Sequence, residues 1–443
     1  MGRFGTSFGG HPELMEGLTA ASATPQTLAQ KLIARAAGRV RVSPGEIVTC
    51  RVDLAMFHDS SGPRRLKPML EELRARIWDP SRVVLVVDHY VPESDNEARR
   101  IVRIARDWAR EQGLPHVHDS QGICHVVLPQ KGHLRPGLFA VGGDSHSSTG
   151  GAFGAYMFGI GATEMLGVLV TGEIWVQVPN TLRVRFDGTM PKGLMAKDLM
   201  LWIIGRLGMN GGRYQAVEFT GDAVRSMNMA ERMTLCNMTA ELGGQTGLVA
   251  PDAVTVDWLA VHGVNGVDPM PWQSDPGAPV MEEYLVDVGG LAPQVARPHS
   301  PAHACNVGDV VGTPVQVAYI GACTGAKLED LRAAARVLTG RRVADGVSLL
   351  VAPASLADQE TARREGTLGE LLGAGAHLLP TSCGACAGFG SRIPEGATVI
   401  SSTARNFRGR MGAAEAQVYL GSPYTVAASA LKACIADPRE VLA

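Results

Sequence analysis

Aromatic residues are scarce in this chain, long apolar runs are absent, and charge of neither sign dominates. Only 5% of the 443 residues are aromatic, and the formal net charge is −2. A near-neutral chain offers no basic stripe, which argues against nucleic acid and anionic membranes as partners. The most apolar run, Val83–Val87, has the length of a strand and not of a membrane span. These absences favour a soluble globular protein.

Cysteine is also sparse, which argues against a scaffold held by disulfides. The chain has eight cysteines, at positions 50, 124, 236, 305, 323, 383, 386 and 434. The stretch Met1–Gly10 is glycine-rich and has no apolar segment typical of a signal peptide. We therefore expect a cytoplasmic protein, and in that compartment a C-x-x-C pair usually binds metal or acts in redox chemistry.

Glycine, in contrast, is abundant, and its distribution favours an α/β protein with many tight turns. The chain contains 53 glycines, is 45% apolar and is 19% charged. Strand, loop and helix patterns alternate along its whole length, and the length suggests two to four domains. We predict a flexible N-terminal tail and three α/β domains, with the bounds 1–25, 26–180, 181–287 and 288–443.

Several element predictions bear on the candidate site. We expect Thr24 to cap the first helix and Val48–Leu54 to form a strand that leads into a turn at His58. Gly150–Gly172 is small, apolar and glycine-rich, which we interpret as one tightly packed helix. Ser226–Leu242 is predicted to be a second continuous helix.

Three cysteines follow strand patterns and lie among small residues. They are Cys323 and the pair in Cys383-Gly384-Ala385-Cys386. Thiolate sulfur suits iron–sulfur clusters and zinc, and three thiolates can hold a four-iron cluster with one iron left open. Zinc binding and thiol redox chemistry remain alternatives at this level. Cys434 has the pattern of a core residue in the last helix.

Acidic residues and histidines form a second constellation at the ends of predicted strands. Asp88-His89, His125 and Asp144-Ser145-His146 each follow a strand pattern. Ligands of open α/β sheets bind beyond the carboxyl ends of the strands, so these loops can converge on one crevice. An aspartate that holds its histidine charged makes a general acid, which can protonate a departing hydroxyl.

Two more groups complete the set of candidate residues. Arg405 and Arg410 are expected to point inward from a glycine-punctuated loop, with Arg408 outward, and a guanidinium matches a carboxylate bidentately. Asn237 and Glu241 are spaced i and i+4, which would place them on one helix face.

The ordered motifs together resemble the aconitase superfamily, most closely the large subunits of 3-isopropylmalate dehydratase and homoaconitase. The resemblance runs from about residue 26 to the C-terminus. It is carried by Val87-Asp88-His89, Gly122-Ile123-Cys124-His125, Gly143-Asp144-Ser145-His146, Cys236-Asn237-Met238, Ile320-Gly321-Ala322-Cys323-Thr324, Cys383-Gly384-Ala385-Cys386 and Arg405-Asn406-Phe407-Arg408-Gly409-Arg410.

The resemblance implies three α/β/α domains around a [4Fe–4S] cluster whose open iron binds substrate. By similarity, the cluster ligands are Cys323, Cys383 and Cys386. The catalytic residues implied are Asp88, His89, His125, Asp144, His146 and Glu241. The substrate-binding residues implied are His58, Ser145, Asn237, Arg405 and Arg410.

The resemblance also implies a partner. Single-chain relatives have a further swivelling domain that brings a serine base, and this chain has no room for it after its last predicted helix, Thr425–Ile435. A separate small subunit is therefore expected to supply that domain.

The chain departs from the family pattern near the cluster and the arginine loop. Ala322, Gly325, Ala326, Lys327 and Ala404 replace the usual residues. We therefore expect a hydro-lyase of the 3-isopropylmalate dehydratase type that acts on a 2-substituted malate. The alternatives are a paralogue for homoaconitate, for methylmalate or citraconate, or for a malate of specialised metabolism, and a non-enzymatic iron or redox sensor. A zinc-dependent lyase that uses the same thiols is a further alternative.

Overall fold

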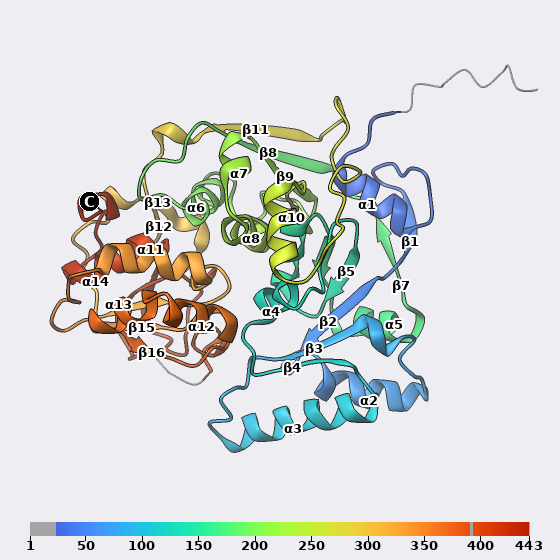
Figure 1. Ribbon diagram of the computed structural model, residues 1–443, viewed down its shortest axis with the longest axis horizontal. Coiled ribbons are helices and arrows are strands. Elements are labelled where there is room, and N and C mark those ends of the chain that lie inside the picture. The colour runs from blue at the N-terminus through green and yellow to red at the C-terminus, as the bar shows by residue number, and fades with distance from the viewer. Residues whose placement is uncertain (1–23, 390–392, 443) are drawn as a thin grey trace, which may run out of the picture.

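The computed structural model describes residues 24–389 and 393–442, and three mostly parallel sheets form its framework (Figure 1). The first is a five-stranded sheet with the order β4-β3-β2-β5-β6, and all its strands are parallel. Its strands are β2 (Leu54–His58), β3 (Val83–Val87), β4 (His116–Asp119), β5 (Phe139–Gly142) and β6 (Tyr156–Gly159).

The second sheet is parallel and four-stranded, with the order β10-β9-β8-β11. It comprises β8 (Thr181–Asp187), β9 (Ala216–Thr220), β10 (Thr246–Leu248) and β11 (Glu282–Asp287). A separate antiparallel pair joins β1 (Ile47–Arg51) to β7 (Glu173–Gln177).

The third sheet is seven-stranded, with the order β13-β12-β18-β17-β14-β15-β16. Strands β14 to β18 are parallel, and β12 pairs antiparallel with β13 and β18. The strands are β12 (Gln294–Ala296), β13 (Ala304–Asn306), β14 (Val317–Ile320), β15 (Ser348–Val351), β16 (His377–Leu378), β17 (Thr398–Ser401) and β18 (Gln417–Leu420).

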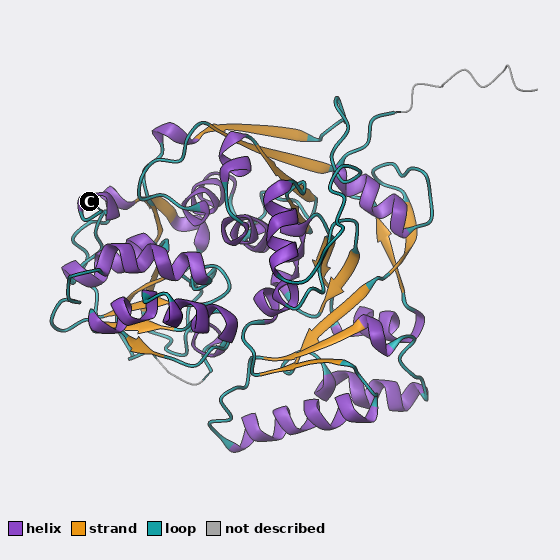
Figure 2. Cartoon of the chain, in the orientation of Figure 1, coloured by secondary structure: helices purple, strands orange, loops and turns teal. Residues whose placement is uncertain are grey.

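Helices pack around the sheets and between them (Figure 2). They are α1 (Leu28–Ala36), α2 (Pro63–Leu73), α3 (Asn96–Glu111), α4 (Cys124–Gln130), α5 (Ala162–Thr171), α6 (Ala196–Leu207), α7 (Asp222–Ser226), α8 (Met229–Asn237), α9 (Thr239–Leu242), α10 (Ala253–Val261), α11 (Leu328–Leu338), α12 (Leu356–Arg364), α13 (Thr367–Gly373) and α14 (Pro423–Lys432). Short 3-10 turns are η1 (Pro80–Arg82), η2 (Ser145–Phe153), η3 (Val288–Gly290), η4 (Pro301–His303), η5 (Val307–Asp309), η6 (Gly384–Ala387) and η7 (Pro438–Glu440).

Strand β3 explains how the first sheet is positioned. Its five residues are all fully buried, as a continuous run of β-branched and apolar residues predicts for a central parallel strand. Val83, Leu85 and Val87 pack into the core under helices α1, α2 and α3. Val84 and Val86 point the other way, into the core shared with the second and third sheets. The alternation of side chains along a strand therefore fixes the first sheet against the other two.

The predicted helix Gly150–Gly172 is wrong. That stretch contains the end of η2, strand β6 and helix α5, with Gly154 and Gly172 in the left-handed region at φ +69° and +73°. The glycines in η2 serve close backbone approach instead. A Cβ on Gly151 would lie 1.6 Å from the carbonyl oxygen of Gly247 in β10.

Other element predictions also need correction. Ser226–Leu242 is broken into α8 and α9 at Met238. The N-cap of α1 is Thr27 rather than Thr24. His58 ends strand β2, which follows β1 as a separate element, so it is not in a turn. Cys434 lies just beyond α14, half-buried and bridged to Pro314, rather than inside a helical core.

Each of the three large sheets draws its strands from one of the ranges 26–180, 181–287 and 288–443, but the domain bounds themselves stay a prediction. The predicted tail, residues 1–25, lies almost wholly outside the described residues. Within the described part of the chain, every helix is too short or too polar to span a bilayer.

The contact between η2 and β10 gives a stability prediction. Gly151→Ala is expected to lower the free energy of unfolding by between about 1 and 3 kcal/mol, because backbone and not a flexible side chain occupies the space. Gly167→Ala is the control, since no atom lies within 4 Å of its added Cβ in exposed helix α5. It should be neutral or stabilise by up to about 1 kcal/mol. Denaturant unfolding of both variants checks this, and equal midpoints would contradict it.

Candidate active site

The carboxyl ends of parallel strands bring the candidate residues of the first sheet together. His58 ends β2, Asp88 and His89 follow β3, and Asp144 follows β5. His125 lies in the first turn of α4, after β4. Neighbouring parallel strands end at one edge of a sheet, so these side chains lie close together there.

The pair Asp88 and His89 is buried and held in one orientation. The Oδ1 atom of Asp88 lies 2.7 Å from Nδ1 of His89, and its Oδ2 accepts a 2.7 Å hydrogen bond from the backbone N–H of Cys124. Burial alone would lower the pKa of His89, but the carboxylates of Asp88, Asp59 and Asp144 outweigh it and raise the pKa to about 9. His89 is therefore an imidazolium at neutral pH, with Nδ1 engaged by Asp88.

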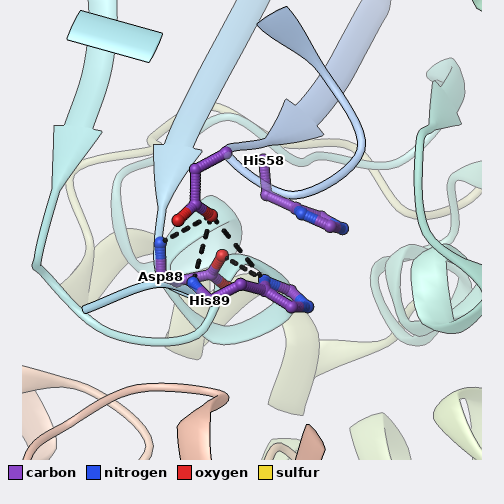
Figure 3. Close-up of side chains that lie close together, drawn as sticks. His58, Asp88 and His89 are labelled. Atoms are coloured by element: carbon purple, nitrogen blue, oxygen red, sulfur yellow. Dashed lines mark hydrogen bonds and ion pairs between the residues drawn. The ribbon is translucent and has the colours of Figure 1, made fainter. Parts of the chain in front are cut away.

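The imidazole of His58 lies over that of His89 (Figure 3). The ring centroids are 3.8 Å apart and the planes are 12° from parallel. Nδ1 of His58 accepts the backbone N–H of Ser61 at 3.3 Å, so a neutral ring carries its proton on Nε2. That Nε2 lies 3.6 Å from Oδ2 of Asp144, beyond hydrogen-bond distance.

Asp144 links two further histidines. Its Oδ1 lies 2.8 Å from Nε2 of His125 and also accepts the backbone N–H of His146 at 2.8 Å. Burial would raise the pKa of Asp144, but His125, His146 and His58 hold it well below the usual range. The carboxylate thus stays ionised and fixes the rings around it.

Glu241, from α9, connects this network to the arginine loop after β17. Its Oε1 lies 2.9 Å from Nε2 of His146 and accepts a 2.6 Å hydrogen bond from Nε of Arg405. Arg405 also donates to Oγ of Ser145 at 2.8 Å. Burial would raise the pKa of Glu241, but His146 and Arg405 lower it to about 2.

The three cysteines meet this network from the third sheet. The backbone N–H of Cys383 donates to the carbonyl of Asp88 at 2.9 Å, and Nδ2 of Asn237 donates to Sγ of Cys323 at 3.2 Å. A hydrogen bond from Cys383 and the nearby Arg410 lower the pKa of Cys386 to about 6, despite burial. Asn237 and Glu241 therefore contact different partners from two helices, rather than sharing one helix face as predicted.

Several buried polar atoms of these residues have no hydrogen-bond partner among the described residues. They are Nε2 of His58, Oδ1 of Asn237, Oε2 of Glu241, the Tyr319 hydroxyl and Nε of Arg410. Each unpaired buried polar atom costs about 1–3 kcal/mol, so such a concentration indicates a site built for a polar ligand. Donors beside three thiols also fit a cluster, whose sulfurs accept hydrogen bonds.

Some residues that support the site were not among the predicted site residues. Both oxygens of Asp59 accept backbone N–H groups of the β3 loop, the shortest from Tyr90 at 2.8 Å. The amine of Lys197 donates to the carbonyls of Ser402 and Thr403 at 2.9 and 2.6 Å, and burial lowers its pKa to about 8. Lys197 stands beside Asp198 at the start of a helix that is mostly apolar in its middle, and this was the one available hint.

Two of the departures from the family pattern have physical explanations. A Cβ on Gly325 would lie 2.2 Å from Oγ of Ser402, which instead accepts the backbone N–H of Gly321 at 2.9 Å. The amine of Lys327 donates to the carbonyl of Cys323 at 2.9 Å and pairs with Asp330 at 2.8 Å. Both residues thus hold the Cys323 loop, and nothing in the structure explains Ala326 or Ala404.

Comparison with known proteins gives a consistent family match. The model of the aconitase family (aconitate hydratase) matches residues 30–314 and 308–433. The chain is 43% identical to 3-isopropylmalate dehydratase large subunit 1 of Methanopyrus kandleri, over 94% of this chain and 100% of that protein. It is 41% identical to the probable methanogen homoaconitase large subunit of Methanothermobacter thermautotrophicus, over 93% and 97%.

Among solved structures, the chain is similar to aconitase X of Thermococcus kodakaraensis in its holo form. The TM-score is 0.47 and the identity 12%, over 81% of this chain and 84% of that one.

The charge of His89 is testable by pH. Because its pKa is raised to about 9 from an ordinary 6.5, its ion pair with Asp88 stabilises the fold fully below pH 6.5 and is lost as pH rises through 9. Histidine NMR titration should show the His89 imidazolium persisting above pH 8, with a midpoint above that of His146, whose pKa is raised to about 8. Asp88→Asn should move the higher of these two titrations to lower pH. A wild-type spectrum in which every ring titrates near or below 6.5 would contradict the assignment.

Proposed function

The chain belongs to the aconitase family of hydro-lyases, and from that premise we propose that it is the cluster-bearing large subunit of a dehydratase for a 2-substituted malate. Membership of the family implies an iron–sulfur cluster. The reaction would remove water from a hydroxy acid and add it back through an unsaturated intermediate. The substrate would be 3-isopropylmalate or a close relative.

One observation carries this proposal, the direct contact between the cysteine loops and the acid–base residues. The Cys383 N–H bonds the Asp88 carbonyl at 2.9 Å, and Asn237 bonds Cys323 at 3.2 Å. Thiols that served only as a structural zinc site would need no buried imidazolium beside them. Cys323, Cys383 and Cys386 would hold a [4Fe–4S] cluster, which when bound supplies a Lewis acid for the substrate hydroxyl and carboxylate.

His89 is suited to protonate the departing hydroxyl. Its Nδ1 is engaged by Asp88, so the proton to be donated is on Nε2. A raised pKa of about 9 keeps that proton in place until the hydroxyl acquires negative charge. His58 stacks on the ring and limits its rotation.

The remaining residues would bind and orient the substrate. Arg405 is fixed by Glu241 and Ser145, and its guanidinium fork matches a carboxylate. Arg410 has an unpartnered, buried Nε, which a second carboxylate can satisfy. Oε2 of Glu241 is also unpartnered and can accept a hydrogen bond from the substrate hydroxyl or from water.

We further infer a second chain. The relatives of this protein are named large subunits, and a large subunit implies a small one. That chain would supply the base for the carbon-bound proton and much of the pocket for the variable substituent. Relatives of both the isopropylmalate and the homoaconitate type have similar identity, 43% and 41%, so identity does not select between these substrates.

Anaerobic reconstitution tests the cluster ligands. With ferrous iron and sulfide, the wild-type chain should become brown and bind about four irons. Cys323→Ser, Cys383→Ser and Cys386→Ser should each lose most of that iron, because each removes one thiolate. Cys50→Ser is the matched control, since Cys50 is buried near the carbonyl of Ile33 and away from the site. A colourless wild-type protein with tightly bound zinc would reject the proposal.

An assay of turnover tests whether the large subunit needs a second chain for activity. The reconstituted large subunit alone should dehydrate substituted malates poorly or not at all, and addition of the small subunit should produce activity. A panel of 3-isopropylmalate, homoisocitrate and citramalate would identify the substrate class.

His89→Gln provides the control for that assay. It should retain the cluster's absorption but lose about 100-fold or more of the paired activity, because the general acid is gone. Appreciable turnover by the isolated chain would contradict the requirement for a partner.

A further inference from the structure

Three histidines gather at a second place, on the free edge of the five-stranded sheet. His116 and His118 are two residues apart on edge strand β4, so their side chains share one face of the sheet. His133 lies three residues after the end of α4. All three are half-buried and accessible, and none belongs to the constellation described above.

The rings point at one another. The Nε2 atoms of His118 and His133 are 2.8 Å apart. The ring of His116 packs edge-on against His133, with centroids 4.9 Å apart and planes at 71°. The centroids of His118 and His133 are 5.0 Å apart. His133 is thus the centre of the cluster, with one histidine of β4 on each side.

Two facing Nε2 atoms cannot both carry a proton at this separation. Burial, His118, His116 and Lys131 together lower the pKa of His133 to about 4, and burial also lowers the pKa of His118. These two rings are therefore neutral at physiological pH, which is the form that coordinates metal. The nearest acidic residue on β4, Asp119, is already engaged by Arg106 at 2.6 Å.

We propose that His116, His118 and His133 form a binding site for one divalent transition-metal ion of the zinc class. Imidazole is the ligand that suits zinc, cobalt and nickel. With metal–nitrogen distances of about 2.0–2.1 Å, two ligand atoms of a tetrahedral site lie about 3.3 Å apart. The His118–His133 pair needs to open by only about half an ångström to reach this spacing. His116, whose ring centroid lies 4.9 Å from that of His133, would have to turn about its side-chain torsions to supply the third nitrogen. Water can complete the coordination.

The position of the site gives the ion a structural consequence. It would clip β4 to the segment after α4 and so close a loop, 118–133, that contains α4. The N-terminal turn of α4 carries His125 and the Cys124 N–H that binds Asp88. A metal that holds both ends of this loop would limit local opening of that turn. Lys131 opposes the ion electrostatically, but it is exposed and can turn away.

Cobalt is the probe, used on the full chain after cluster reconstitution and removal of other metals. Wild-type protein should take up one more equivalent of Co²⁺ than His133→Gln or His118→Gln, with visible bands of low-symmetry cobalt, and its thermal midpoint should rise on cobalt addition. Both variants should lose that equivalent and that rise. His377→Gln, at an exposed histidine of β16, should behave as wild type.

Because cobalt uptake by each variant is subtracted from that of the wild type, cobalt bound to other carboxylates and imidazoles cancels. Equal thermal midpoints of wild type and variants before cobalt is added show that the fold is intact, and His116→Gln at the sheet edge gives a third, independent variant. Equal cobalt uptake by wild type and His133→Gln would overturn the proposal and leave a hydrogen-bonded histidine pair.

Discussion

The site depends on keeping three carboxylates ionised. Asp88 and Glu241 are fully buried and Asp144 is half-buried, and in such places an unpaired charge is strongly disfavoured. Each is paired with histidine or arginine, and the pairs are joined through shared partners such as His146. Removal of any one member would leave a charge without compensation. This constraint explains why Asp144, His146, Glu241 and Arg405, from different parts of the chain, are bonded in one chain of contacts, beside the separate Asp88–His89 pair.

The same network defines what can enter the site. The carboxylates and imidazoles largely satisfy one another, and the atoms left over include donors on His58 and Arg410 and acceptors on Asn237 and Glu241. A hydroxy acid with two carboxylates offers complementary groups. The thiols of Cys323, Cys383 and Cys386 lie beside these atoms. Asn237 donates a hydrogen bond to Sγ of Cys323, and the backbone N–H of Cys383 donates to the Asp88 carbonyl. Polar complementarity on one side and soft ligands on the other suit a metal-assisted dehydration.

The sequence was sufficient for much of the framework, because its signals were local. The valine run of β3 appears where it was expected, because a parallel strand that is buried on both faces reads as a continuous apolar run. The prediction of a single helix for Gly150–Gly172 was wrong because small apolar residues show no hydrophobic periodicity, so a turn, a strand and a helix look alike there. The prediction of one continuous helix for Ser226–Leu242 was wrong because the break at Met238 comes from tertiary contacts. Asn237 and Glu241 pack against different partners there.

The candidate residues were found through strand-end motifs, but their pairings depend on contacts between distant segments. No local pattern links Arg405 to Glu241, and the role of Asp59 in accepting backbone N–H groups is invisible in a sequence.

The most direct test of the proposed open-iron centre is Mössbauer spectroscopy of the chain reconstituted with ⁵⁷Fe. One iron environment distinct from the rest, which shifts when substrate is added to the paired subunits, is expected for three thiolate ligands. Iron environments that do not respond to substrate would contradict the open coordination position.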